Sequence, residues 1–325
     1  MKHTLIHILE SICALFALGL ASCVGGDKER VEIAPLYRSL GSLSAMTAEQ
    51  VDSLLQADSV QISVLTQYLG LPDSRAGLQE LAGSKAVEKF TPDVERAFPS
   101  LASLEKQLAY ILSKGADEGF AFPRRRYGAV VWGKYKSMVL TDSCMLIALN
   151  HYLGADYEGY AGWPDYVRGQ KDAHNLPYDI AEALVANQMP FVWSEQSTVL
   201  SRLLYEGALV LAKLRLTPDG NLAGALGYTD SQLEWLKTHS NTIWNSLVVN
   251  DLLYSTREEV AERLVAPSPS ASIVGLDVPG RVGRYVGYCI VVAYLQQNST
   301  AKLPQLLRPE FYDNPSILIE SAYNG

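Results

Sequence analysis

Glu206 is the residue whose setting most strongly indicates chemistry. It is an acidic residue in the middle of an apolar stretch, residues 194–214. Apolar or small residues recur at helical spacing along one side of this stretch: Leu200, Leu204, Gly207, Leu211 and Leu214. The opposite side has Tyr205, Leu209 and Ala212. A helix that is apolar nearly all round lies inside a protein, where an unpaired carboxylate costs several kcal/mol. We therefore expect a buried or half-buried ion pair with Arg202, one turn earlier, or with Arg281 or Arg284 from a later helix.

The histidines show no recognisable metal-ligand spacing. His151, His174 and His239 are scattered along the sequence, and a lone histidine is more often a hydrogen-bonded structural residue than a ligand. The glycines at 280, 283 and 287 lack both the leading strand and the Lys-Ser/Thr ending of a phosphate loop. For these glycines we expect close helix packing instead.

Residues 153–175 form the second candidate region. They combine several glycines with aromatic residues, a composition typical of a long loop, and loops of this length often have functions. The candidate contact surface consists of Tyr157, Tyr160 and Trp163. These residues support one alternative function, a binding module for cell-surface glycan or peptide.

The elements that position these residues are mainly helical. Helix starts are predicted at Thr47, at Asp73 or Ser74, at Thr91-Pro92 and at Ser100, within a helical part that extends to about residue 116. Strands are predicted at 127–132 and 137–149, joined by a turn at Gly133-Lys134, in one small sheet within 126–149. Further helices are predicted at 178–187, 194–214, 229–253, 256–264 and 281–297, with two short ones after Lys302. The fold class is α+β, predominantly helical with one small sheet.

Composition excludes several classes of protein. Apolar residues make up 48% of the chain and charged residues 19%, as in ordinary globular proteins. The net charge of −8 makes nucleic acid an improbable partner. The strongest later apolar run, residues 286–295, is too short to cross a bilayer. Cys144 and Cys289 lie in apolar runs, so unpaired burial is favoured over a disulfide.

The N-terminus predicts export and lipid attachment. Lys2 precedes an apolar segment that ends in Leu20-Ala21-Ser22-Cys23, the order that resembles the lipobox of bacterial lipoproteins. We expect a signal peptide over residues 1–22, an acylated (palmitate-type) Cys23, a flexible tether over 23–30 and a single domain over 31–325. Attached acyl chains would hold the protein on a membrane.

Several motifs in the C-terminal half resemble the gliding motility lipoprotein B family. They are Tyr205-Glu206-Gly207, Gly227-Tyr228-Thr229, Gln232-Leu233-Glu234-Trp235, Ile243-Trp244, Asp251-Leu252-Leu253-Tyr254-Ser255 and the run from Gly280 to Tyr288. A looser similarity extends upstream through residues 149–157. The resemblance covers most of the chain after Cys23.

That family is itself similar to zinc peptidases whose central helix has the motif His-Glu-x-x-His, with two histidine ligands and a glutamate that activates water. In this chain the corresponding residues are Tyr205, Glu206 and Leu209, so both ligands are missing. The resemblance implies a zincin-like fold and a pseudoenzyme with no metal and no cofactor.

By the same resemblance, the expected function is a non-catalytic accessory role in gliding motility or the associated secretion machinery. The expected location is the outer membrane, at its periplasmic face or the cell surface, and the expected partners are envelope proteins. The alternative is an active hydrolase that uses Glu206 with ligands from elsewhere, such as His151 or His239.

Overall fold

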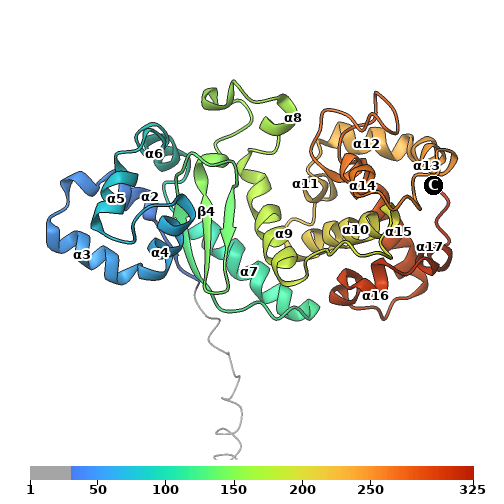
Figure 1. Cartoon of the computed structure of the whole chain (residues 1–325), viewed down its shortest axis with the longest axis horizontal. Helices are drawn as coiled ribbons and strands as arrows, with labels where there is room; N and C mark the ends of the chain where they lie inside the picture. Colours follow the sequence, from blue (N-terminus) through green and yellow to red (C-terminus); the bar gives the residue numbers. More distant parts are fainter. Residues whose placement is uncertain (1–30) are drawn as a thin grey trace, which may run out of the picture. The chain divides into compact units, whose positions relative to one another are not determined.

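The computed structural model describes residues 31–325. A four-stranded sheet contains β1 (Ile33–Ala34), β2 (Arg126–Val130), β3 (Met138–Leu140) and β4 (Cys144–Ala148). The helices before β2 are α2 (Leu36–Gly41), α3 (Ala48–Ala57), α4 (Ser59–Leu69), α5 (Arg75–Ala82), α6 (Lys85–Ala97) and α7 (Ala102–Glu118). Those after β4 are α8 (Asp165–Arg168), α9 (Leu176–Gln188), α10 (Val199–Leu216), α11 (Leu222–Leu226), α12 (Asp230–Thr238), α13 (Ser240–Val249), α14 (Glu258–Val265), α15 (Val282–Gln297), α16 (Pro309–Tyr312) and α17 (Ser316–Ser321). Short 3-10 turns lie at Leu43–Ala45, Leu149–His151, Glu158–Tyr160, Ala173–Asn175 and Leu303–Leu307. The predicted class, mainly helical with one small sheet, is correct (Figure 1).

The sheet has the order β1-β2-β4-β3, with β1, β2 and β4 parallel and β3 antiparallel to β4. The prediction of one strand over 137–149 was wrong, because the stretch turns back on itself at residues 141–143. Thr141 makes that turn: its Oγ1 accepts a hydrogen bond from the Cys144 amide at 3.0 Å. β4 is buried along its whole length, and helix α4 packs against both β2 and β4.

Side-chain caps set two N-terminal helix starts where the sequence predicted them, whereas α7, predicted to start at Ser100, has Leu101 as its N-cap. Thr47 accepts from the Gln50 amide in a capping box at the start of α3, and Ser74 accepts from the Gly77 amide at the start of α5. Thr91-Pro92 does not begin a helix. Ser84 caps α6 instead, and Pro92 lies inside it, where the buried face of the helix against α2 outweighs the lost hydrogen bond.

The predicted helix over 229–253 is divided into α12 and α13 at His239. The His239 ring stacks on Trp235, with ring centroids 4.0 Å apart, and its Nδ1 lies 2.7 Å from the Trp235 carbonyl oxygen. This contact holds the backbone at φ −105° and ψ 12°. Helix α11 was not predicted. Asn221 caps it, and Gly227, at φ +73°, ends it.

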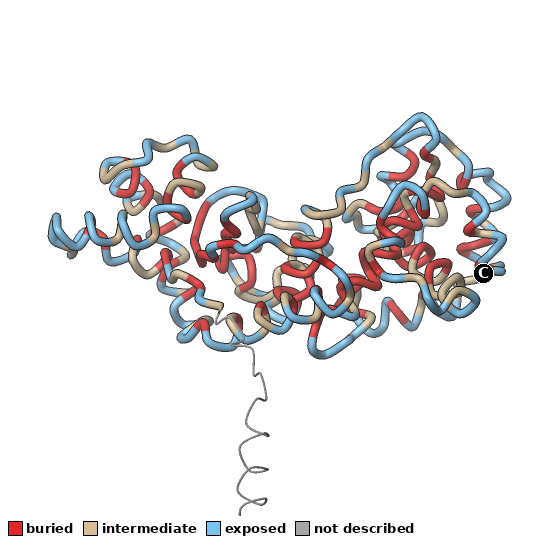
Figure 2. Tube along the Cα trace, turned by 90° about the horizontal axis from the view of Figure 1, so that it is seen from below, coloured by how far each residue is buried: buried red, intermediate tan, exposed pale blue. Residues whose placement is uncertain are grey.

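Helix α10 lies in the core, as its apolar pattern predicted. Fifteen of its 18 residues are buried, and it packs against α7, α9, α14 and α15. Figure 2 shows buried segments inside both the sheet region and the helical C-terminal part. Among the described residues 31–325, no helix is long and apolar enough to cross a membrane.

Helices α10 and α15 approach each other at two glycines. A Cβ atom on Gly207 would overlap the Gly287 backbone, and one on Gly287 would overlap the Leu203 carbonyl. The same contact aligns the polar side chains of the two helices. The expected close helix packing is confirmed for Gly283, which lies against Leu203 and Leu264, and for Gly287, whereas a Cβ atom on Gly280 would overlap the backbone of Ser268, outside the helices.

We predict that Gly207→Ala destabilises the protein by about 1–3 kcal/mol, because the added methyl group forces the two helices apart. Urea unfolding measures the change. Gly162→Ala is the matched control, since a Cβ atom on Gly162 would meet nothing within 4 Å, and it should shift stability by less than about 0.5 kcal/mol. Equal effects of the two substitutions would contradict the close contact.

Candidate functional site

The Glu206 carboxylate lies between two arginines. Its Oε1 is 3.0 Å from Arg202 Nη2, one turn earlier on α10, and its Oε2 is 2.8 Å from Arg284 Nε on α15. The Glu206 side chain is 8% exposed. Two of the three arginines that the sequence indicated therefore contact Glu206. Arg281 makes no ion pair with it, because Arg281 precedes the first turn of α15 and binds elsewhere.

The ion pair extends to a third helix. Arg284 Nη2 lies 2.7 Å from Glu182 Oε1 on α9, and Lys213 Nζ of α10 lies 2.6 Å from Glu182 Oε2. Burial alone would lower the pKa of Arg284, but the Glu182 and Glu206 carboxylates raise it above its usual value. Burial would raise the pKa of Glu182, but Arg284 and Lys213 hold it well below its usual range. We call Glu182, Glu206, Lys213 and Arg284 the core charge cluster.

The sequence singled out only half of this cluster. Lys213 and Glu182 were missed, although the signal for Lys213 was present: it is a charged residue in the same apolar stretch as Glu206. Glu182 is one acidic residue on an ordinary amphipathic helix, so only its position opposite α10 gives it this role.

Tyr205 and Leu209, which lie close to Glu206 on α10, have structural roles. The Tyr205 hydroxyl donates to the Met189 carbonyl at 2.9 Å, and its ring packs against Phe191 and Tyr312. Leu209 is buried. The Tyr205 phenol is thus held by a backbone carbonyl, and Leu209 offers only an alkyl side chain. Within residues 31–325, no group of three or more His, Cys, Asp or Glu side chains is placed to hold a metal ion.

A second polar group links the edge of the sheet to α9. Ser137 Oγ lies 3.0 Å from His151 Nδ1 and accepts a hydrogen bond from Lys171 Nζ at 2.9 Å. Nearby, the Tyr152 hydroxyl donates to Asp179 Oδ2 at 2.8 Å. Burial lowers the pKa of His151 to about 3 and lowers the pKa of Lys171, so His151 is neutral at physiological pH.

The aromatic residues of the loop within 153–175, here called the aromatic loop, pack on one another and on the protein. Tyr160 is 1% exposed, its ring stacks on Trp163 with centroids 4.9 Å apart, and its hydroxyl donates to the Asn150 carbonyl. The Tyr157 hydroxyl donates to Asp93 at 2.6 Å. The three residues therefore form one packed cluster. The expectation that Tyr160 contributes to a contact surface is wrong, because its ring and hydroxyl are both used internally.

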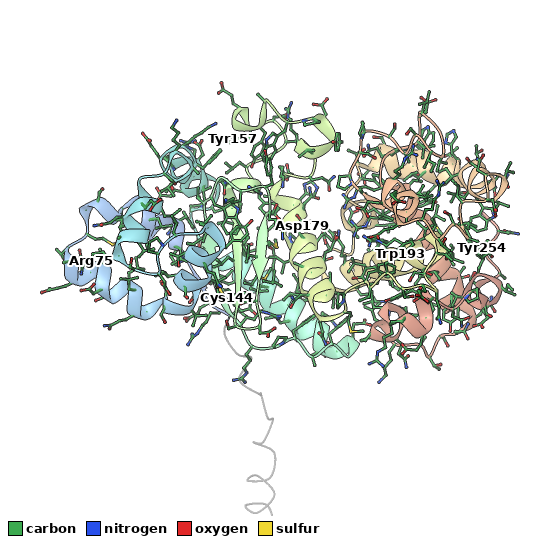
Figure 3. All side chains as sticks on the ribbon, viewed as in Figure 1. Arg75, Cys144, Tyr157, Asp179, Trp193 and Tyr254 are labelled. Carbon is green, nitrogen blue, oxygen red and sulfur yellow. The ribbon has the colours of Figure 1, made fainter. Side chains whose placement is uncertain are left out.

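A pocket of about 850 Å³ lies beside this loop. It is lined by three segments that are distant in sequence, within residues 164–178, 219–232 and 267–281. Arg281 is among its lining residues. Figure 3 labels Asp179 on α9 and Tyr157 on the loop before α8. The sequence did not predict this pocket, because none of its three segments has a recognisable motif.

Both cysteines of the described chain are free, as the sequence favoured. Burial raises the pKa of Cys144 to about 12 and that of Cys289 to about 11. Neither thiol is therefore activated as a nucleophile at neutral pH. The predicted lipid attachment residue, Cys23, lies outside the described residues.

These features define a mainly helical α+β protein built on a core helix whose glutamate is ion-paired. Over residues 26–325 the chain matches the family model described as gliding motility protein GldB, and it belongs to this family. Family membership implies a role in gliding motility. No curated protein and no solved structure matches the chain, so the similarity to zinc peptidases and the zincin-like architecture stay expectations.

We predict that Arg284→Met destabilises the protein by about 3–5 kcal/mol, because it leaves buried carboxylates without a counter-ion. The matched control is Arg75→Met. Arg75 lies 2.6 Å from Asp52, but the two side chains are 42% and 56% exposed, so its loss should cost less than about 1 kcal/mol. Urea unfolding of both variants measures the difference. Similar small losses would show that the core charge cluster does not stabilise the fold.

We predict that His151 makes the protein acid-sensitive. Its folded-state pKa of about 3 lies below the usual 6.5, so below pH 6.5 the unfolded chain binds a proton that the folded chain excludes, and stability falls with pH. From pH 7 to pH 5, wild type should lose about 2 kcal/mol more than His151→Gln. Urea unfolding at the two pH values measures this. Equal losses would contradict a buried neutral His151.

Proposed function

We propose that the protein is a membrane-anchored lipoprotein with a non-catalytic, accessory role in gliding motility or the associated protein-secretion machinery. The family match over residues 26–325 supports the motility role. One observation carries the non-catalytic part: both oxygens of Glu206 are paired with arginines. A general base must be able to reach a water or substrate proton. Glu206 is buried, and its carboxylate is already ion-paired with Arg202 and Arg284.

The anchoring part depends on the N-terminal sequence. Leu20-Ala21-Ser22-Cys23 follows an apolar segment, and acylation of Cys23 would attach the domain to a bilayer. We place the protein at the outer membrane, with envelope proteins of the machinery as its partners. Protease treatment of intact cells would distinguish the cell surface from the periplasmic face.

The hydrolase alternative requires ligands or bases close to Glu206. The two histidines available for it have other partners: His151 Nδ1 lies against Ser137, and His239 Nδ1 lies 2.7 Å from the Trp235 carbonyl oxygen. Neither contact involves Glu206. The alternative of a glycan- or peptide-binding surface on the aromatic loop has less support, because Tyr160 is buried.

We predict that deletion of the gene impairs colony spreading or the release of secreted proteins, and that wild type restores it. Cys23→Ser should move the protein from the membrane to the soluble fraction and fail to restore the phenotype, because an unacylated chain has no anchor. Cys13→Ser, within the predicted signal peptide, is the matched control and should behave as wild type. Fractionation in high salt, with spreading and secretion assays, measures both effects.

Two results would contradict the proposal. Membrane retention of Cys23→Ser in high salt would rule out lipid anchoring through this residue. Stoichiometric zinc in the purified protein, removed by a chelator and lost in Glu206→Gln, would favour the hydrolase.

A further inference from the structure

The pocket beside residues 164–175 has a cation without a counter-ion in direct contact. Arg281 lines it and donates from Nη1 to Gln170 Oε1 at 2.7 Å, while Gln170 donates from Nε2 to the Gly227 carbonyl at 2.8 Å. The Arg281 Nε atom is buried without a hydrogen-bond partner. Within residues 31–325 Arg281 forms no direct ion pair with a carboxylate, and Glu182 and Asp179 attract it only through longer-range electrostatics.

The backbone holds Arg281 in an unfavourable conformation. Its φ of +67° lies in the left-handed region, which residues other than glycine rarely adopt. Strained backbone of this kind is concentrated at binding and active sites. Burial and the positive charge of Arg284 lower the pKa of Arg281, and the opposing effect of the Glu182 and Asp179 carboxylates does not fully offset them. A bound anion would relieve this unfavourable environment.

The other charges of the pocket select the kind of anion. Its lining contains Arg281 and three carboxylates, Asp165, Asp219 and Asp230. Asp165 already faces Arg168 at 3.5 Å, and Asp219 accepts one hydrogen bond from the Tyr178 hydroxyl. One arginine matches one carboxylate, whereas the aspartates repel a phosphate or another polyanion. The same aspartates favour a positive group on the ligand.

The size of the pocket is consistent with a small ligand. Its volume of about 850 Å³ lies within the range of small-molecule sites, roughly 300–1,000 Å³. The ligand that these charges favour has a carboxylate to pair with Arg281 and a cationic group to pair with Asp219 and Asp230. A basic amino acid, free or at the C-terminus of a peptide, has both groups.

We propose that this pocket binds a zwitterionic ligand of that class, with its carboxylate on Arg281 and its cationic group facing Asp219 and Asp230. Arg281 interacts electrostatically with Glu182 and Arg284 of the core charge cluster but makes no ion pair within it. The proposed site does not depend on the accessory role proposed above. It gives the protein a ligand-binding activity in addition to its family role.

Calorimetry on the purified protein tests the proposal with four probes: the tripeptide Ala-Ala-Lys, its C-terminal amide, free lysine and inorganic phosphate. The tripeptide should bind at least about tenfold more tightly than its amide, because the amide lacks the charge that pairs with Arg281. Phosphate should not compete. Lysine that binds as tightly as the tripeptide would support the site and identify a free amino acid as its source.

Variants assign the binding to the pocket. Arg281→Gln should weaken tripeptide binding at least about tenfold, and Arg257→Gln, at an exposed arginine outside the pocket, should leave it unchanged. Asp230→Asn changes an exposed residue and should weaken binding of Ala-Ala-Lys but not of Ala-Ala-Ala. Absence of tripeptide binding, competition by phosphate, or equal affinity of the amide would overturn the proposal.

Discussion

The ion pair of Arg284 with Glu182 and Glu206 is the interaction on which the helical part of the molecule depends. The Arg284 side chain is 2% exposed, and its guanidinium lies between carboxylates from α9 and α10. A charge at this depth is tolerated only with partners in close contact. The three helices are therefore restricted to arrangements that keep these atoms together, which a purely apolar core would not require.

The close approach of α10 and α15 makes this contact possible. Gly207 and Gly287 let the two backbones meet, so that Arg284, one turn before Gly287, reaches across to α9 and α10. The glycine contact and the charge cluster are thus two parts of one interface. The same arrangement explains the character of Glu206, whose carboxylate stabilises a helix interface through its ion pairs with Arg202 and Arg284.

Arg281 and Arg284 show how position along a helix decides the role of a side chain. They are three residues apart, but Arg284 lies inside α15 and faces the core charge cluster, whereas Arg281 precedes the helix with a left-handed backbone. From there Arg281 contacts Gln170 on the loop after α8 and lines the pocket. One short segment therefore serves both the stability of the core and a candidate binding site.

The sequence by itself determined the class of fold, the burial of α10 and the need of Glu206 for an arginine, because apolar periodicity and the cost of burying a charge are properties of a single segment. It also indicated helix starts at Thr47 and Ser74, since caps are local hydrogen bonds. Only the tertiary structure decided which arginines pair with Glu206 and that Glu182 and Lys213 extend this ion-pair network. It also decided that the Tyr160 ring is buried. It alone showed the turn that divides residues 137–149 and the pocket around Arg281, because these depend on segments far apart in the chain meeting in space.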